Sequence, residues 1–349
     1  MKLVAEQGAT LSRDEARGLI TPMLAPASEE ETPSDVEIAA LLTALAVRGE
    51  TADELTGVAE AMRALAVPLA LTDQERAKLV DTCGTGGDGL GTFNISTGAA
   101  LVAVAAGAHV AKHGNRAVTS QCGSADVLEA LGIPVTLTPE SAVECLRATG
   151  FMFLYAPALH PALKRVQPVR RALGFRTIFN LAGPLTNPAG APAQVMGVFS
   201  ESKLMLVAEA MARLGILSGL VAHGRNGMDE IALSVTDVVE VSVSDGQPGV
   251  SQVKYSPEMF GMKRASVREL KGGSTAAENA ALLEAIFAGQ QGAKRNIVIV
   301  NAAAALFVGK VAGSLEEGVR LAAEAIDSGA VRDKVEQLRS FERSKGVRQ

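Results

Sequence analysis

A glycine-rich segment, GTGGDGLG at residues 84–91, lies between a short apolar run and an alanine-rich one. Because glycine has no side chain, the backbone N–H groups of such a loop can approach an anion closely. Asn94, Ser96 and Thr97 then open an expected helix, whose N-terminus favours negative charge. Asn94 and Ser96 are also common helix N-cap residues, a role that can coexist with anion binding. The segment therefore predicts a site for one phosphate group or more.

Two familiar nucleotide-binding loops do not fit this segment. Gly84, Gly86 and Gly89 satisfy GxGxxG, but a dinucleotide loop needs an acidic residue about 20 positions further on. No Asp or Glu occurs between Gly89 and Ala125, and no Gly-Lys-Ser/Thr ends the segment as in a Walker loop. Asp88 is its acidic residue, and the sequence leaves open whether it orients the loop, a metal ion or a ligand hydroxyl.

A second segment rich in hydrogen-bond donors is AKHGNR (111–116), followed by further hydroxyl side chains. Two donor-rich loops at one sheet edge would suit a ligand with two phosphate groups. Isolated cations are, however, more often solvated surface groups. The residues concerned are Lys112, His113, Arg116, Thr119, Ser120 and Ser124.

His109 and His113 are four residues apart, a spacing that on a helix can hold zinc. This segment is expected to be a strand, and Val110 stands where HExxH requires glutamate. We therefore expect no zinc site and interpret His109 as a packed residue.

Asp229 and Glu230 stand side by side after the segment VAHGRNGM (221–228). Adjacent carboxylates in a loop are often simply solvated. Near a polyphosphate they are also oxygen ligands of the kind that magnesium binds together with phosphate oxygens. The sequence leaves both interpretations open.

These residues need an α/β sheet to position them. Strand 78–84, helix 96–106 and strand 109–114 form an expected βαβ unit, with the glycine loop at the carboxyl end of its first strand. A hairpin is expected over 238–255, around Asp245-Gly246. The large domain, 76–349, is therefore predicted to be α/β with a mainly parallel central sheet. Its further expected strands are 134–138, 151–155, 194–199, 218–224 and 296–301.

Residues 1–75 predict a small all-helical N-terminal domain. Its helices begin with S/T-x-x-E capping boxes, and in the second helix Val36, Ile38, Leu41, Leu42 and Leu45 recur at helical spacing before Gly49. Such apolar stripes are expected to meet another domain or a second subunit as well. The proline-rich stretch 156–193 is interpreted as a crossing segment that returns to this domain around 160–190 with a helix or two. The capping boxes are Ser12–Glu15, Ser34–Glu37 and Thr51–Glu54.

Composition sets outer limits on function. The chain has 349 residues, 48% of them hydrophobic and 20% charged, which is ordinary for a globular protein. No apolar run approaches the roughly 18 residues of a membrane span, and the N-terminus lacks a signal-peptide core, so we expect a cytoplasmic location. Three cysteines without zinc spacing fit a reducing compartment. A net charge of −5 and 3% aromatic residues argue against a nucleic-acid partner.

Taken together, the motifs resemble those of the anthranilate phosphoribosyltransferase family, in the nucleoside-phosphorylase-like phosphoribosyltransferase group. The resemblance covers nearly the whole chain. Cys122 departs from it, since the family pattern has serine there. The matching motifs are GTGGD (84–88), NIST (94–97), KHGNR (112–116), GSAD (123–126), HPALKRVQPVR (160–170), GFRTIFNLAGPLTNP (174–188) and the pair Asp229-Glu230.

The resemblance implies transfer of the phosphoribosyl group from phosphoribosyl pyrophosphate (PRPP) to the amine of anthranilate, in tryptophan biosynthesis, by a homodimer. Two Mg²⁺ ions would be held by Ser96, Asp229 and Glu230. Anthranilate would contact Gly84, His113, Asn115 and Arg170. PRPP would be bound by Gly84, Gly87, Asp88, Thr92, Asn94, Ile95, Ser96, Thr97, Lys112, Ser120 and Ser124.

The mechanism implied is electrostatic. Magnesium, Lys112 and loop amides would neutralise the charge that develops on the departing pyrophosphate. The amine would attack the oxocarbenium-like ribose carbon from the opposite face, with inversion. The aromatic amine is already neutral near pH 7, so no general base is obligatory. The rival interpretations are a pyrimidine-nucleoside phosphorylase and a non-catalytic relative that binds nucleic acid. The Asp229-Glu230 pair and the 160–170 segment argue against the first.

Overall fold

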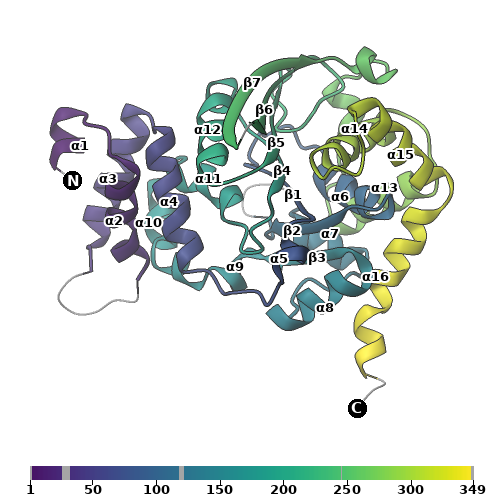
Figure 1. The fold of residues 1–349 in the computed structure, drawn as a ribbon, viewed down its shortest axis with the longest axis horizontal. Coiled ribbons are helices and arrows are strands. Elements are labelled where there is room, and N and C mark those ends of the chain that lie inside the picture. The colour runs from purple at the N-terminus through teal and green to yellow at the C-terminus, as the bar shows by residue number, and fades with distance from the viewer. Residues whose placement is uncertain (1, 26–31, 118–121, 245, 347–349) are drawn as a thin grey trace.

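The structure is a computed structural model that describes residues 2–25, 32–117, 122–244 and 246–346. It contains a group of N-terminal helices, a central sheet and a set of C-terminal helices (Figure 1). The strands are β1 Leu79–Gly84, β2 His109–Gly114, β3 Phe151–Tyr155, β4 Ala193–Gly197, β5 Ser218–Gly224, β6 Thr236–Ser244 and β7 Gln247–Tyr255. The α-helices are α1 Lys2–Gln7, α2 Arg13–Leu24, α3 Asp35–Arg48, α4 Ala52–Ala64, α5 Asp73–Arg76, α6 Ile95–Ala105, α7 Ser124–Ala130, α8 Pro139–Thr149, α9 Ala156–Leu159, α10 Gln167–Leu173, α11 Ile178–Ala182, α12 Leu204–Arg213, α13 Ala276–Phe287, α14 Ala293–Val308, α15 Leu315–Asp327 and α16 Ala330–Gly346. The 3₁₀ helices are η1 Pro161–Arg165, η2 Gly183–Thr186, η3 Glu201–Lys203, η4 Pro257–Phe260 and η5 Val267–Leu270.

The sheet has seven strands in the order β3-β2-β1-β4-β5-β6-β7. Strands β3, β2, β1, β4 and β5 pair in parallel, and the β6–β7 hairpin adds two antiparallel strands at one edge. The predicted α/β class with a mainly parallel sheet is therefore confirmed. The expected strands at 78–84, 109–114, 151–155, 194–199 and 218–224 and the hairpin all occur, within a residue or two of their expected bounds.

The order of the strands places a topological switch point between β1 and β4. From β1 the chain runs outward through β2 to β3, and then returns to the other side of β1 to form β4 and β5. In open parallel sheets, ligands bind in the crevice beyond the carboxyl ends of the strands at such a point. The glycine loop follows β1, so it lies at this crevice.

The N-terminal helices α1 to α4 lie together at one end of the molecule (Figure 1). All three expected capping boxes are present, and Ile38, Leu41, Leu42 and Leu45 of α3 are buried. The crossing segment returns to this group as expected, because α10 contacts α3 and α11 contacts α4. On α3, Val36 departs from the predicted stripe: it is 78% exposed, and Val47 is 83% exposed.

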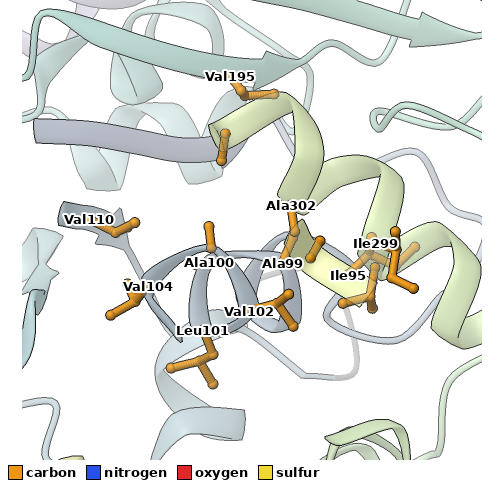
Figure 2. Packing of buried hydrophobic residues seen from close by; sticks show 14 of the residues in the cluster. Ile95, Ala99, Ala100, Leu101, Val102, Val104, Val110, Val195, Ile299 and Ala302 are labelled. Carbon is orange, nitrogen blue, oxygen red and sulfur yellow. The ribbon is translucent and has the colours of Figure 1, made fainter. Parts of the chain in front are cut away.

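The two faces of the sheet have different cores. On one face α6 packs against α14, with Ile95 and Ala99 beside Ile299 and Ala302 (Figure 2). On the other, residues of α12 and the sheet join the apolar residues of α2 to α4 and of the crossing segment in one continuous cluster. The helical group thus buries its apolar stripes partly against the rest of the chain.

Two expected strands are wrong. Residues 296–301 belong to α14, which is buried on nearly every side and so shows no periodicity that separates a helix from a strand. Residues 134–138 have the alternation of a strand but form none, since β3 already ends the sheet and Thr138 caps α8. His109, expected to be packed, is exposed at the start of β2.

Candidate functional site

The glycine loop adopts a backbone that requires glycine. Gly86, Gly87, Gly89 and Gly91 have φ values of +67°, +77°, +72° and +65°, in the left-handed region where a side chain causes strain. Asp88 Oδ1 accepts a hydrogen bond from the backbone N–H of Leu90 at 3.0 Å, so this carboxylate orders the loop itself. Its Oδ2 atom is buried without a hydrogen-bond partner among the described residues, and is available to a ligand or a cation.

Asp229 lies directly across the ends of β1 and β4. Gly84 and Gly197 are partners in the sheet register, and a Cβ on Gly197 would lie 1.5 Å from the Asp229 carbonyl oxygen. A Cβ on Gly84 would lie 2.9 Å from Asp229 Oδ2. The same oxygen accepts a hydrogen bond from the Gly86 N–H at 2.8 Å. The two strand-end glycines therefore let the acidic loop after β5 meet the glycine loop after β1.

The carboxylates of Asp88, Asp229 and Glu230 lie close enough to disfavour one another's ionised forms. Burial and then the neighbouring Asp88 raise the pKa of Asp229 from 3.8 to about 7. Burial and then Asp229 raise the pKa of Glu230 well above its ordinary value, while Lys112 opposes that shift. A divalent cation would relieve the repulsion, and the oxygen donors fit magnesium. Among the described residues, no group of three or more His, Cys, Asp or Glu side chains is arranged to hold a metal ion by itself.

Lys112 and Ser96 are joined by a hydrogen bond between their side chains. Lys112 is buried on β2, and its Nζ donates to the Thr82 carbonyl oxygen at 2.6 Å and to Ser96 Oγ at 3.3 Å. Burial lowers the pKa of Lys112, whereas Asp81 and Glu230 raise it. Ser96 also supplies a backbone hydrogen bond that lowers the pKa of Glu230. The structure thus joins Lys112, Ser96 and Glu230, three residues taken from distant parts of the sequence.

The start of α6 presents backbone and amide groups. Asn94 is the N-cap residue but makes no capping side-chain bond; its Nδ2 donates instead to the Cys122 carbonyl oxygen at 3.1 Å. Its Oδ1 is buried and accepts no hydrogen bond from the described residues. Ile95 and Thr97 are each 1% exposed, so only their backbone could serve a ligand. Thr92 pairs with Lys271 in an isolated bridge at the end of the glycine loop.

Two buried histidines meet at the end of β2. The rings of His113 and His160 are edge to face, with centroids 5.1 Å apart. Burial lowers the pKa of His113 to about 3 and that of His160 to about 4. Both Nε2 atoms are buried without a hydrogen-bond partner in the described parts of the chain. His113 was among the expected site residues, whereas His160 was only part of a matching motif.

The other residues expected at the aromatic site are less closely joined. Asn115 holds the loop after β2, its carbonyl oxygen accepting from Ser124 Oγ at 3.2 Å. Arg170 lies on α10 with its guanidinium carbon 5.4 Å from the centre of the Phe179 ring, and burial lowers its pKa. Among the described residues, no hydrogen bond or ring contact joins Arg170 to His113 or Asn115. Ser120 and Thr119 lie outside the described residues.

Several polar residues at the site were missed from sequence. Asn301 of α14 accepts from the Ile231 N–H at 3.1 Å and donates to the Ile231 carbonyl oxygen at 2.9 Å, directly after Glu230. Because residues 296–301 were expected to form a strand, Asn301 was not recognised as a residue of the site. Asp81 is buried on β1 and accepts from the His113 N–H at 3.2 Å and from Gln194 at 3.3 Å. Arg176 donates to the Gly87 carbonyl oxygen.

Comparisons with known proteins agree with this architecture. Residues 2–66 match the helical bundle domain of the glycosyl transferase family, and residues 76–332 match its a/b domain. Anthranilate phosphoribosyltransferase of Solibacter usitatus is 51% identical over 312 residues, covering 89% of this chain and 90% of that protein. The enzyme of Symbiobacterium thermophilum is 48% identical, covering 98% and 96%.

Solved structures of the same kind superpose over almost the full length. Anthranilate phosphoribosyltransferase from Thermus thermophilus has a TM-score of 0.89 at 45% identity, covering 98% of this chain and all of that one. The Saccharomyces cerevisiae enzyme in complex with PRPP and Mg has a TM-score of 0.86 at 25% identity, covering 98% and 96%. With its switch-point glycine loop and facing acidic loop, this chain belongs to the anthranilate phosphoribosyltransferase family.

Proposed function

We propose that this protein transfers the phosphoribosyl group of PRPP to the amine of anthranilate, releasing pyrophosphate and forming N-(5′-phosphoribosyl)anthranilate for tryptophan biosynthesis. The observation that carries the proposal is the contact of Asp229 with Gly84 and Gly86 at the switch point of the sheet. It brings an amide-rich loop and two carboxylates to one place, as binding of a diphosphate with a cation requires. Relatives named for this activity cover the whole architecture.

The phosphoribosyl donor would bind over the glycine loop and the start of α6. Main-chain N–H groups of the loop and of the first helical turn would contact phosphate oxygens, helped by the Asn94 side chain. Lys112 would act through Ser96 and through its charge, since its ammonium is buried. The donor site comprises Gly84, Gly87, Asp88, Thr92, Asn94, Ile95, Ser96, Thr97, Lys112, Ser120 and Ser124.

Ser96, Asp229 and Glu230 would hold two Mg²⁺ ions, and Asp88, whose Oδ2 atom has no hydrogen-bond partner among the described residues, is close enough to raise the pKa of Asp229. When bound, these ions would neutralise the diphosphate and its developing charge as it leaves. A yeast relative has been solved in complex with PRPP and Mg. The unfavourable charge of three close carboxylates supports the assignment.

Anthranilate would lie between the end of β2 and the crossing segment, contacting Gly84, His113, Asn115 and Arg170. Its carboxylate would pair with the Arg170 guanidinium, a charge-assisted contact. His113 is buried and its pKa is lowered to about 3, so it offers an uncharged ring and no competing charge. The yeast relative has also been solved with 4-fluoroanthranilate.

The reaction needs little proton chemistry from the protein. As the bond between ribose C1 and pyrophosphate breaks, loop amides and Lys112 stabilise the leaving oxygen, and an oxocarbenium-like carbon develops. The amine of anthranilate attacks from the opposite face and inverts C1. The amine then loses its proton, for which no obligatory base is assigned. Positioning of the two substrates and electrostatic stabilisation of the leaving group would together account for most of the acceleration.

The direct test is to mix the purified protein with PRPP, MgCl₂ and anthranilate and to follow anthranilate fluorescence. Loss of that fluorescence with formation of phosphoribosyl anthranilate is expected. Unchanged fluorescence together with phosphate-dependent cleavage of thymidine or uridine would identify a pyrimidine-nucleoside phosphorylase instead.

Three further expectations from the sequence are part of this proposal. The chain would divide near residue 75 into a helical domain and an α/β domain joined by the crossing segment. A homodimer would form through the helical domain, where Val36 and Val47 are exposed on α3. A cytoplasmic location stays a prediction; no helix in the described residues is long and apolar enough to span a bilayer. Light scattering after size exclusion would test the dimer.

A further inference from the structure

Arg176 connects the crossing segment to the glycine loop. It lies in the short connection between α10 and α11, and its side chain is exposed. Its guanidinium donates a hydrogen bond to the carbonyl oxygen of Gly87. A Cβ on Gly87 would lie 3.1 Å from its Nη2 atom, so backbone and guanidinium are in direct contact. The segment that carries Arg170 therefore also touches the loop proposed to bind diphosphate.

An aromatic ring holds the guanidinium in place. The Arg176 Cζ atom lies 3.8 Å from the centre of the Phe199 ring, which follows β4. The Phe199 N–H donates to Thr85 Oγ1 at 3.1 Å, and the Thr85 N–H donates to the Gly197 carbonyl oxygen at 2.9 Å. A continuous set of contacts thus joins Thr85 of the glycine loop to Phe199, and Phe199 to Arg176.

Among the residues that the structure describes, no acidic side chain pairs with Arg176. Arg165, on the same crossing segment, pairs with Asp35, whereas none of the ion pairs among the described residues includes Arg176. A guanidinium has five N–H donors, and the Gly87 carbonyl takes one nitrogen. Its planar fork suits phosphate oxygens better than an ammonium does.

We propose that Arg176 binds the diphosphate of the phosphoribosyl donor and positions the Gly87 turn for it, linking the donor site to the crossing segment that bears Arg170. The inference rests on the proposed function and adds a cation to it that the family resemblance did not assign. It explains why an exposed arginine is held from two sides at the edge of a loop made of backbone.

The experiment compares steady-state kinetics of the wild type with those of Arg176→Gln, Arg176→Lys and Phe199→Leu. Arg171→Gln is the matched control, because Arg171 is exposed on the same segment. Arg176→Gln is expected to raise KM for PRPP about tenfold, as expected for a charged hydrogen bond, and KM for anthranilate by less than about twofold. Arg176→Lys should lie between the wild type and Arg176→Gln, and Arg171→Gln should match the wild type.

The ring supplies a second readout. Phe199→Leu should raise KM for PRPP by a smaller factor, and adding it to Arg176→Gln should raise KM no further, since both act through the guanidinium. Unchanged KM for PRPP in Arg176→Gln, or equal rises for both substrates, would overturn the proposal. Should a variant lose turnover, calorimetry with PRPP and MgCl₂ decides: about tenfold weaker binding supports the proposal, and wild-type affinity refutes it. Wild-type turnover of anthranilate separately establishes the function, whatever Arg176 does.

Discussion

The two halves of the candidate site differ in their electrostatic character. At the glycine loop, three carboxylates, a buried lysine and main-chain amides crowd together, and the pKa values of Asp229 and Glu230 are raised. At the end of β2, two buried histidines have lowered pKa values and unpartnered Nε2 atoms among the described residues. The first region concentrates negative charge, which the proposed magnesium ions would balance. The second keeps its histidines uncharged, and in the proposal it takes the flat ring of anthranilate, with Arg170 as the charged contact.

The largest effect is expected where the charged half loses an acid. Glu230→Gln should lower kcat by on the order of 10²–10³-fold, because stabilisation of the leaving charge is lost. KM for anthranilate should change by less than about twofold. Stopped-time fluorescence assays at saturating MgCl₂ measure both values. Glu209→Gln on α12, a half-exposed acid, is the control and should behave as the wild type. An equal fall in kcat for Glu209→Gln, or a large rise in KM for anthranilate in Glu230→Gln, would contradict the proposed difference between the two halves.

Asn301→Ala tests whether the acidic loop depends on its support. Asn301 fixes both backbone groups of Ile231, so its loss should let Glu230 move and raise the MgCl₂ concentration for half-maximal rate about 10–100-fold. Thermal unfolding should be measured alongside, and Asn301→Asp, which keeps one acceptor, should recover part of the effect. A destabilised variant with an unchanged magnesium requirement would show a purely structural role.

Arg170→Ala addresses the other half. Loss of a charged contact should raise KM for anthranilate about tenfold or more, while KM for PRPP stays within about twofold. Titrating each substrate at saturation of the other provides the measurement. Equal rises in both constants would contradict the carboxylate role of Arg170.

The dependence of stability on acid pH should test the half of the site that contains the two histidines. His113 and His160 have folded-state pKa values of about 3 and about 4, below the ordinary 6.5. At a pH between about 4 and 6.5 the unfolded chain therefore binds more protons than the folded protein. The free energy of unfolding should fall as the pH drops through this range. His160→Gln should flatten this slope modestly in thermal unfolding between pH 4 and 7. A slope as steep as the wild type's would remove His160 as its cause.

Sequence predicted the elements that carry the site better than the residues that support it. The strand-end position of the glycine loop followed from the change to a βαβ pattern after residue 78. Asp229-Glu230 could be singled out as a pair, but only the paired glycines Gly84 and Gly197 reveal that Asp229 reaches the loop. Local patterns carry no information about such long-range contacts.

The missed residues show the same limit. Asn301 lies in a helix that is buried on nearly every side, where periodicity does not distinguish a helix from a strand, and no local pattern marks its bond to Ile231. Arg176 and His160 stood in matching motifs, yet their partners, Gly87 and His113, lie far away in the sequence. Their roles depend on which chain segments the sheet order brings together.

The most direct test of the account is calorimetry of PRPP with the wild type and with Glu230→Gln, each in MgCl₂ and in EDTA. We expect tight binding by the wild type in MgCl₂, and binding weaker by about tenfold or more both in EDTA and in the variant. Equal affinity in all four titrations would contradict the claim that cations held by the acidic loop bind the diphosphate over the glycine loop.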